Sequence, residues 1–248
     1  MKNKTIHITA IGCGNAFSDG GRLQTCFYVA APGGHFLIDC GATSVAGLKR
    51  HRFDLNQIDT VLLSHFHGDH YGGLPYLLLE AAVFGRDAPL TIISPPGCRE
   101  RLQSLLELLY PGSVVLEKLD LRFLEFNETV SACETEYLTV EAFPVTHAAP
   151  TDPHGLRIST AGKVIAYSGD TCWDDNLIRL ARGADFFLCE CNFFRTRSEV
   201  HIDYETLMER LPELDFKHIL LTHAGDEMLQ HLNEIELPCA EDGMQFSI

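Results

Sequence analysis

Four residues that can bind a metal ion lie within a stretch of six, and no other feature restricts this chain as strongly. The stretch is His65-Phe66-His67-Gly68-Asp69-His70, between an apolar strand-like segment and an apolar helical one. Buried imidazole and carboxylate groups need polar partners, so packing alone explains the cluster poorly. At a strand-to-helix turn, His65 and His67 can face one ion, and Asp69 and His70 can face a second. The stretch predicts a metal site; the alternative is a histidine-rich loop with adventitious metal affinity.

Three further residues of ligand type each follow a separate apolar, strand-like segment. They are His147, Asp170 and His223. A single residue in such a position is more often a helix cap or a turn residue. Three in the same context favour a shared site at the carboxyl ends of strands, where open α/β sheets bind their ligands. Gly68 and Gly72 are expected to supply the backbone freedom of the metal-binding turn.

Hydrophobic periodicity predicts a layered α/β fold with helices outside two sheets. No linker, charge block or repeat divides the chain, which predicts one domain over 1–248. The expected strands are 5–11, 26–31, 35–39, 58–63, 90–93, a strand-like region at 114–144, 156–159, 163–168, 185–189 and 218–221. The expected helices are 44–52, 72–84, 97–110, 176–182, 204–211 and 225–234.

Composition restricts the partners and the compartment. With 34 acidic and 19 basic side chains, the formal net charge is −15, which disfavours a protein that grips long phosphate backbones. No apolar run reaches the roughly 18–20 residues of a membrane span, and Met1–Ile8 has no signal-peptide pattern. The nine cysteines include no CxxC pair, so reduced thiols are expected. These features predict a cytoplasmic protein without membrane contacts.

The seven ligand-type residues, in this order, resemble the metallo-β-lactamase-fold superfamily of binuclear metallohydrolases. The H-x-H-x-D-H loop carries the resemblance with the three later residues, and it spans nearly the whole chain. The resemblance implies a four-layer αβ/βα sandwich and, because family members are often dimers, a homodimer. It implies that one metal ion is bound by His65, His67 and His147, a second by Asp69, His70 and His223, and both by Asp170.

Two divalent cations close together would lower the pKa of a shared water and supply hydroxide at neutral pH. Asp69 would lie beside both ions and orient that hydroxide, which gives it a catalytic role as well. The mixture of imidazole and carboxylate ligands suits zinc, but also manganese or iron.

Two segments resemble the ribonuclease Z-like and phosphodiesterase branch of the superfamily. One is the glycine-rich opening Ile11–Ala16. The other pairs Glu190 with His201, which take the places of a family glutamate and histidine although their flanking residues differ. A carboxylate that holds a histidine protonated makes a general acid for an alkoxide leaving group. The alternatives are a structural hydrogen bond, or His201 acting as the cap of the helix that starts near Asp203.

Common bacterial ribonuclease Z carries a long tRNA-binding arm between the residues that correspond to His147 and Asp170. Only 22 residues separate these two positions here, enough for one hairpin. With the acidic charge, this favours a small anionic substrate, namely a cyclic nucleotide or another cyclic phosphate, over long nucleic acid. The alternatives are a lactone or thioester hydrolase on the same metal site, with Tyr71 or Tyr204 assisting, and an arm-less ribonuclease Z-like RNA 3′ processing nuclease. Arg195 and Arg197 form the one basic cluster on an expected site loop.

Overall fold

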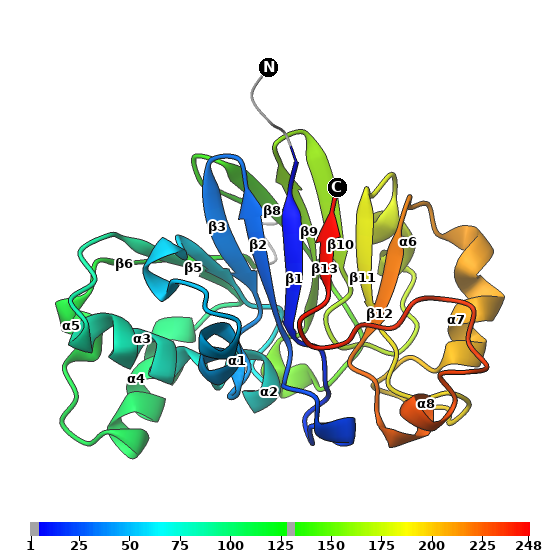
Figure 1. Cartoon of the computed structure of the whole chain (residues 1–248), viewed down its shortest axis with the longest axis horizontal. Coiled ribbons are helices and arrows are strands. Elements are labelled where there is room, and N and C mark those ends of the chain that lie inside the picture. Colours follow the sequence, from blue (N-terminus) through cyan, green and yellow to red (C-terminus); the bar gives the residue numbers. More distant parts are fainter. Residues whose placement is uncertain (1–4, 128–131) are drawn as a thin grey trace.

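The computed structural model describes residues 5–127 and 132–248, which form two mixed sheets packed face to face (Figure 1). The first sheet has the strand order β13-β1-β2-β3-β4-β5-β6 and the second has the order β12-β11-β10-β9-β8-β7. The first sheet contains β1 (His7–Gly12), β2 (Cys26–Ala31), β3 (Gly34–Ile38), β4 (Thr60–Leu62), β5 (Leu90–Ser94), β6 (Leu121–Glu125) and β13 (Gln245–Ser247). The second contains β7 (Ala132–Glu134), β8 (Leu138–Pro144), β9 (His154–Thr160), β10 (Lys163–Tyr167), β11 (Phe186–Glu190) and β12 (Ile219–Thr222).

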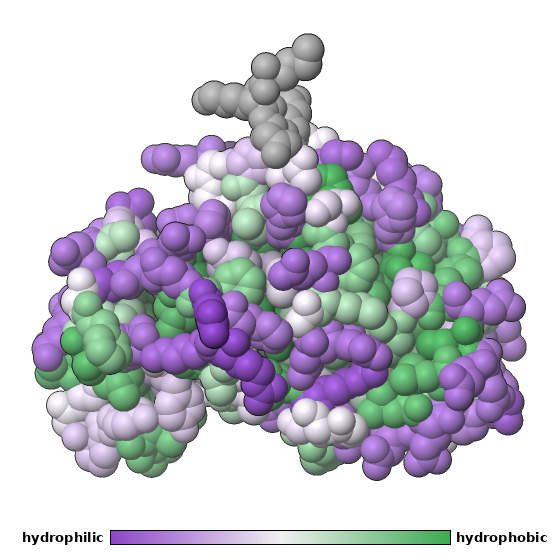
Figure 2. Space-filling model, in the orientation of Figure 1, coloured by the Kyte–Doolittle hydropathy of each residue, from purple (hydrophilic) through white to green (hydrophobic). Residues whose placement is uncertain are grey.

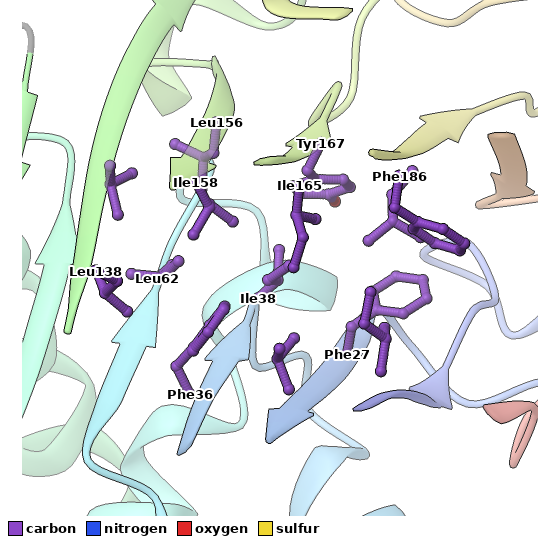
Figure 3. Close-up of a cluster of buried hydrophobic side chains, with 14 of the residues drawn as sticks. Phe27, Phe36, Ile38, Leu62, Leu138, Leu156, Ile158, Ile165, Tyr167 and Phe186 are labelled. Atoms are coloured by element: carbon purple, nitrogen blue, oxygen red, sulfur yellow. The ribbon is translucent and has the colours of Figure 1, made fainter. Parts of the chain in front are cut away.

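The central core lies between the two sheets (Figure 3). Strand residues alternate between the two faces of a sheet, so every second apolar side chain points into this layer. Phe36 and Ile38 on β3 meet Ile158 on β9 and Ile165 on β10 in one buried cluster, in which all four are fully buried. Burying a side chain of this size contributes roughly 1.5–3 kcal/mol to folding.

Helices cover the outer face of each sheet, which completes a four-layer αβ/βα sandwich, as the family resemblance implies. Leucines of the first-sheet helices pack on that sheet, and apolar residues of the later helices pack on the second. The helices are α1 (Ser44–Arg50), α2 (Gly68–Tyr71), α3 (Leu74–Val83), α4 (Cys98–Leu109), α5 (Val115–Lys118), α6 (Asn176–Ala181), α7 (Tyr204–Arg210) and α8 (Asp226–Gln230).

Two expectations need correction. Val115–Lys118 is a helical turn and not part of a strand-like region at 114–144, because Leu116, Glu117 and Lys118 are good helix formers. The strand at Gln245–Ser247 was not expected; it pairs antiparallel with β1 and forms the edge of the first sheet. Part of the 114–144 region, 128–131, and the first four residues of the Met1–Ile8 segment lie outside the described residues. The single-domain division remains a prediction.

The cysteines and the interval between His147 and Asp170 agree with the expectations from the sequence. All nine cysteines are free, and seven of them are buried. One β9–β10 hairpin occupies most of the interval between His147 and Asp170, and no arm protrudes there. Within residues 5–127 and 132–248, no helix combines the length and apolar character that crossing a bilayer requires.

Candidate metal centre

All seven predicted ligands lie along one edge of the sandwich, the lower edge in Figure 1, where α2 is found. His65 and His67 follow β4, and Asp69 and His70 lie on α2 itself. The other three follow strands of the second sheet: His147 after β8, Asp170 after β10 and His223 after β12. The space-filling view of the same face shows this lower edge indented between the two halves of the molecule (Figure 2).

The first group of ligand atoms centres on Nδ1 of His67. That atom lies 3.2 Å from Nε2 of His65 and 3.0 Å from Nε2 of His147. Oδ2 of Asp170 completes the group, 3.9 Å from each of the same two Nε2 atoms. Ligand atoms around a tetrahedral zinc ion with bonds of 2.0–2.1 Å lie roughly 3.3 Å apart, so this spacing fits one ion.

The second group shares the same oxygen of Asp170. It lies 3.2 Å from Nε2 of His70 and 3.3 Å from Nε2 of His223. Oδ2 of Asp69 lies 3.2 Å from both of these nitrogen atoms. The two groups therefore divide the seven residues as the family resemblance implies, with Asp170 common to both. Each group takes two residues from the first-sheet side and two from the second.

The buried polar atoms of the centre fit a bound cation. Nε2 of His70 and Oδ1 of Asp170 are buried and make no hydrogen bond. Burial lowers the pKa of His70, but Asp170, Asp69 and Asp39 outweigh this effect and hold that pKa well above its ordinary value. A concentration of carboxylates that retains a proton on a buried imidazole is an environment that favours positive charge, which a divalent ion would supply.

Asp39, which the sequence analysis missed, orients the metal-binding turn from behind. Its fully buried carboxylate accepts hydrogen bonds from His70 Nδ1, Ser64 Oγ, the Ser64 backbone N–H and Tyr167 OH, each at 2.8 Å. Because Ser64 Oγ donates to Asp39, it accepts from His65 Nδ1, 3.0 Å away. A ligand histidine that donates a hydrogen bond through one ring nitrogen presents the lone pair of the other nitrogen to a metal. Asp39 therefore orients the His70 ring directly and the His65 ring through Ser64. Its place after β3 is the signal that could have identified it.

Glycine is required beside Asp170 and at one of the two predicted glycines. Neither Gly68 nor Gly72 has a positive φ, but a Cβ atom at Gly72 would lie 2.4 Å from the carbonyl oxygen of Gly68, so close approach requires glycine at 72, whereas Gly68 has open space around it. Gly169 has a φ of 61°, and a Cβ atom there would lie 2.5 Å from the carbonyl oxygen of His154. A side chain at this position would displace the strand end that presents Asp170.

Glu190 and His201 form a pair next to the second group. His201 Nδ1 donates to Glu190 Oε1 at 2.8 Å, and the His201 ring stacks on His223 with centroids 5.3 Å apart. Glu190 is fully buried and also accepts from the backbone N–H of Thr171 at 2.9 Å. Burial lowers the pKa of His201, but the Glu190 carboxylate outweighs it and raises that pKa to about 9. Asp203, not His201, caps α7 by accepting from the Thr206 N–H at 2.9 Å, which removes the capping alternative.

Two clefts adjoin the centre. The larger, about 650 Å³, is lined by His147, Val145, Phe126 and His154 among others. The smaller, about 290 Å³, is lined by His201 and His223 among others.

Other residues considered from sequence have different partners. Arg195 pairs with Glu205 at 3.0 Å and Arg197 with Asp203 at 3.5 Å, so each is engaged in a surface ion pair. The Tyr204 hydroxyl accepts from the Glu236 N–H at 2.8 Å, which is a structural contact.

Comparisons with known proteins show which family and which relatives this chain resembles. The family model described as anti-Pycsar protein Apyc1 matches residues 6–239. The anti-Pycsar protein Apyc1 of Bacillus phage 010DV004 is 29% identical over 235 residues, covering 90% of this chain and 91% of that protein. Ribonuclease Z of Clostridium acetobutylicum is 31% identical over 160 residues, covering 64% of this chain but only 52% of its own length.

Among solved structures, the metallo-beta-lactamase fold protein YhfI from Bacillus subtilis superposes with a TM-score of 0.80 at 21% identity, covering 99% of this chain and 100% of that one. This likeness confirms the fold predicted from the sequence. The chain belongs to the anti-Pycsar protein Apyc1 family, within the ribonuclease Z-like and phosphodiesterase branch of the metallo-β-lactamase-fold superfamily.

Proposed function

We propose that this chain is a metal-dependent hydrolase of small cyclic phosphodiesters, with a cyclic nucleotide as the first candidate substrate. The observation that carries the proposal is the pair of ligand groups that share Asp170, with Glu190 and His201 beside them. Membership of the Apyc1 family supports the same reaction class. Two divalent ions bound there would lower the pKa of a bound water and neutralise charge that develops on the phosphate. Zinc is the first candidate for these ions.

The reaction leaves the chain's own residues a defined task. Hydrolysis adds water across the cyclic diester: one P–O bond forms from water, one ester P–O bond breaks, and the released sugar oxygen takes up a proton. His201 is placed to give that proton, because its Nδ1 is engaged with Glu190 and Nε2 is left for the leaving oxygen. Glu190 holds the ring in place and stabilises its charged form. Asp69, at the edge of the second group, is placed to orient the attacking water.

A small anionic substrate suits this centre better than a long nucleic acid. The chain carries a formal charge of −15, so an extended polyanion would lie along a repelling surface. The interval between His147 and Asp170 holds one hairpin and offers no arm to grip tRNA. The adjoining clefts, of about 290 and 650 Å³, lie near or within the range of small-molecule pockets.

The subunit arrangement and location belong to the proposal as well. A homodimer is supported by exposed apolar side chains near the end of α4, where Leu108 is 79% exposed and Leu109 43% exposed. Light scattering of the pure protein at several concentrations would test the dimer. Fractionation of the producing cells would test the proposed cytoplasmic location.

The first experiment measures metal content together with turnover. Purified protein should contain about two divalent ions per chain and hydrolyse bis(p-nitrophenyl) phosphate and 3′,5′-cyclic nucleotides. Asp170→Ala should lower the metal content, whereas His231→Ala, a matched histidine stacked on Phe194 outside the centre, should not. Turnover of a lactone with no turnover of phosphodiesters would refute the phosphodiesterase function while leaving the ligand set intact.

The proton donor is tested by changing the leaving group. His201→Ala should lower kcat for a cyclic nucleotide by about 10²- to 10⁴-fold, because the leaving alkoxide needs a proton. The same variant should change the rate with bis(p-nitrophenyl) phosphate far less, since p-nitrophenolate leaves without one. Equal losses with both substrates would assign His201 a structural role.

A further inference from the structure

We propose that Phe17 is the residue on which the nucleobase of the substrate stacks, in the smaller cleft beside His201. The proposal rests on the function proposed above and assigns a place to the part of a cyclic nucleotide that does not react.

Phe17 is the most exposed of the large apolar side chains in the described residues, with 84% of its surface accessible. Its turn is nevertheless held by several hydrogen bonds. Asn15 Oδ1 accepts from the backbone N–H of Phe17 at 3.1 Å and of Asp19 at 3.2 Å, and Asn15 Nδ2 donates to Asp19 Oδ2 at 2.8 Å. The same Asp19 oxygen accepts from the backbone N–H of Asp226 at 3.0 Å, which fixes the turn to the start of α8. A phenyl ring kept out of the core on a well-anchored turn is available to a ligand.

The ring borders the cleft that reaches the metal centre. Phe17, Phe193, His201 and His223 all line the cavity of about 290 Å³. Phe193 is half-buried, and its ring lies edge-on to His201 with centroids 6.3 Å apart. The cleft therefore runs from the proposed proton donor to two phenylalanines, and its volume suits one flat heterocycle.

The chemistry of a cyclic nucleotide selects this cleft over the larger one. Both ester oxygens of a 3′,5′-cyclic phosphate belong to the same ribose, so the sugar and base lie on the leaving-group side whichever bond breaks. The proton donor must lie on that side too. His201 lines the smaller cleft, whereas the larger cleft adjoins the centre at His147. The nucleoside is thus directed toward Phe17.

Stacking on a phenyl face also sets the expected selectivity. Every nucleobase has a π-face, so an aromatic platform binds bases without reading their hydrogen-bonding edges. The subsite should accept all four common bases, and purines should bind more tightly than pyrimidines because their stacking area is larger.

Phe17→Ala tests the proposal with two substrates that differ only in the base. One is 3′,5′-cyclic AMP, and the other is the methyl ribofuranoside 3′,5′-cyclic phosphate, which carries a methoxy group in place of adenine. The variant should raise KM for cyclic AMP about ten-fold, the size of one lost stacking contact, and leave the baseless substrate unchanged. Phe17→Trp should restore KM and Phe17→Leu should not. Phe84→Ala removes another phenyl ring, 69% exposed, at the end of α3, and should change nothing.

The outcomes separate the two proposals. If wild-type protein hydrolyses cyclic AMP and Phe17→Ala matches it, the base subsite is refuted while the phosphodiesterase function stands. Equal losses on both substrates would also refute it, because Phe17 would then support the centre and not the base. If wild-type protein hydrolyses no cyclic nucleotide, the proposed function fails first.

Discussion

Replacing Asp39 by asparagine should weaken the metal centre without altering any of its seven predicted ligands. One oxygen of the Asp39 carboxylate accepts from His70 Nδ1, Ser64 Oγ and Tyr167 OH, and the other accepts from the Ser64 backbone N–H. Asparagine has nearly the same shape but offers an oxygen on one side only. If that oxygen serves the three side chains, its NH₂ group faces the Ser64 N–H, and two donors oppose each other in a fully buried place.

The magnitude follows from these contacts. An unpaired buried backbone donor costs about 1–3 kcal/mol, and the three remaining hydrogen bonds lose the strengthening that a charged acceptor provides. We expect the free energy of unfolding to fall by about 3–5 kcal/mol, the range for breaking a buried ionic contact. Loss of a group that orients a ligand histidine should also lower metal affinity by about 10- to 100-fold.

The assay is a competition for metal against a chelator, read by elemental analysis, with urea unfolding in parallel. Tyr167→Phe is the matched control: it removes one of the four donors and keeps the carboxylate, so it should cost about 1 kcal/mol and leave metal affinity nearly unchanged. A folded Asp39→Asn protein that binds metal as tightly as wild type would refute the reasoning.

Two further predictions concern stability at residues that are not themselves predicted ligands. Gly169→Ala should lower the free energy of unfolding by about 3 kcal/mol or more, because its Cβ would lie 2.5 Å from the His154 carbonyl oxygen at a φ of 61°. Gly162→Ala, with a φ of 80° but open space around the new Cβ, should cost only about 1 kcal/mol in urea unfolding, and equal effects would contradict the steric explanation. Burial raises the pKa of Asp185, but hydrogen bonds from Lys217, the Val164 N–H and Lys163 outweigh it and hold that pKa below 3.8. A carboxylate whose pKa is lower in the folded than in the unfolded state stabilises the protein at pH values above the unfolded-state pKa. Asp185→Asn should therefore lower the free energy of unfolding by about 1 kcal/mol at pH 7, and the difference from wild type should shrink as the pH falls below about 4. A difference that does not depend on pH would rule out the ionic contribution.

The sequence predicts which candidate ligands the fold brings together, because one rule covers the three that lie far apart in the chain. His147, Asp170 and His223 each follow an apolar strand, and strand ends of one sheet gather at one edge. The same rule applied to Asp39, which follows β3, would have added the residue that orients the turn. It was missed because a lone aspartate before a glycine-containing turn is ordinary in proteins.

Long-range pairing and local exposure could not be read from the sequence. β13 pairs with β1 across the length of the chain, matching Ile8 to Phe246, and no local pattern fixes that partner. Val115–Lys118, by contrast, contains three good helix formers, Leu116, Glu117 and Lys118, so local propensity could have predicted its helical turn. The sequence shows a phenylalanine at position 17 but not its exposure, which depends on segments that meet only in the folded chain.

Because each ligand group takes two residues from either side of the sandwich, the hydrophobic core acts as the spacer of the metal centre. Bulkier or smaller side chains at Ile38 or Ile158 would change the separation of the sheets and, with it, the spacing within both ligand groups. Substitutions at apolar residues far from the candidate metal centre would therefore alter the geometry that the centre offers to a metal ion. Mutagenesis aimed at altered activity should therefore include the apolar residues between the two sheets.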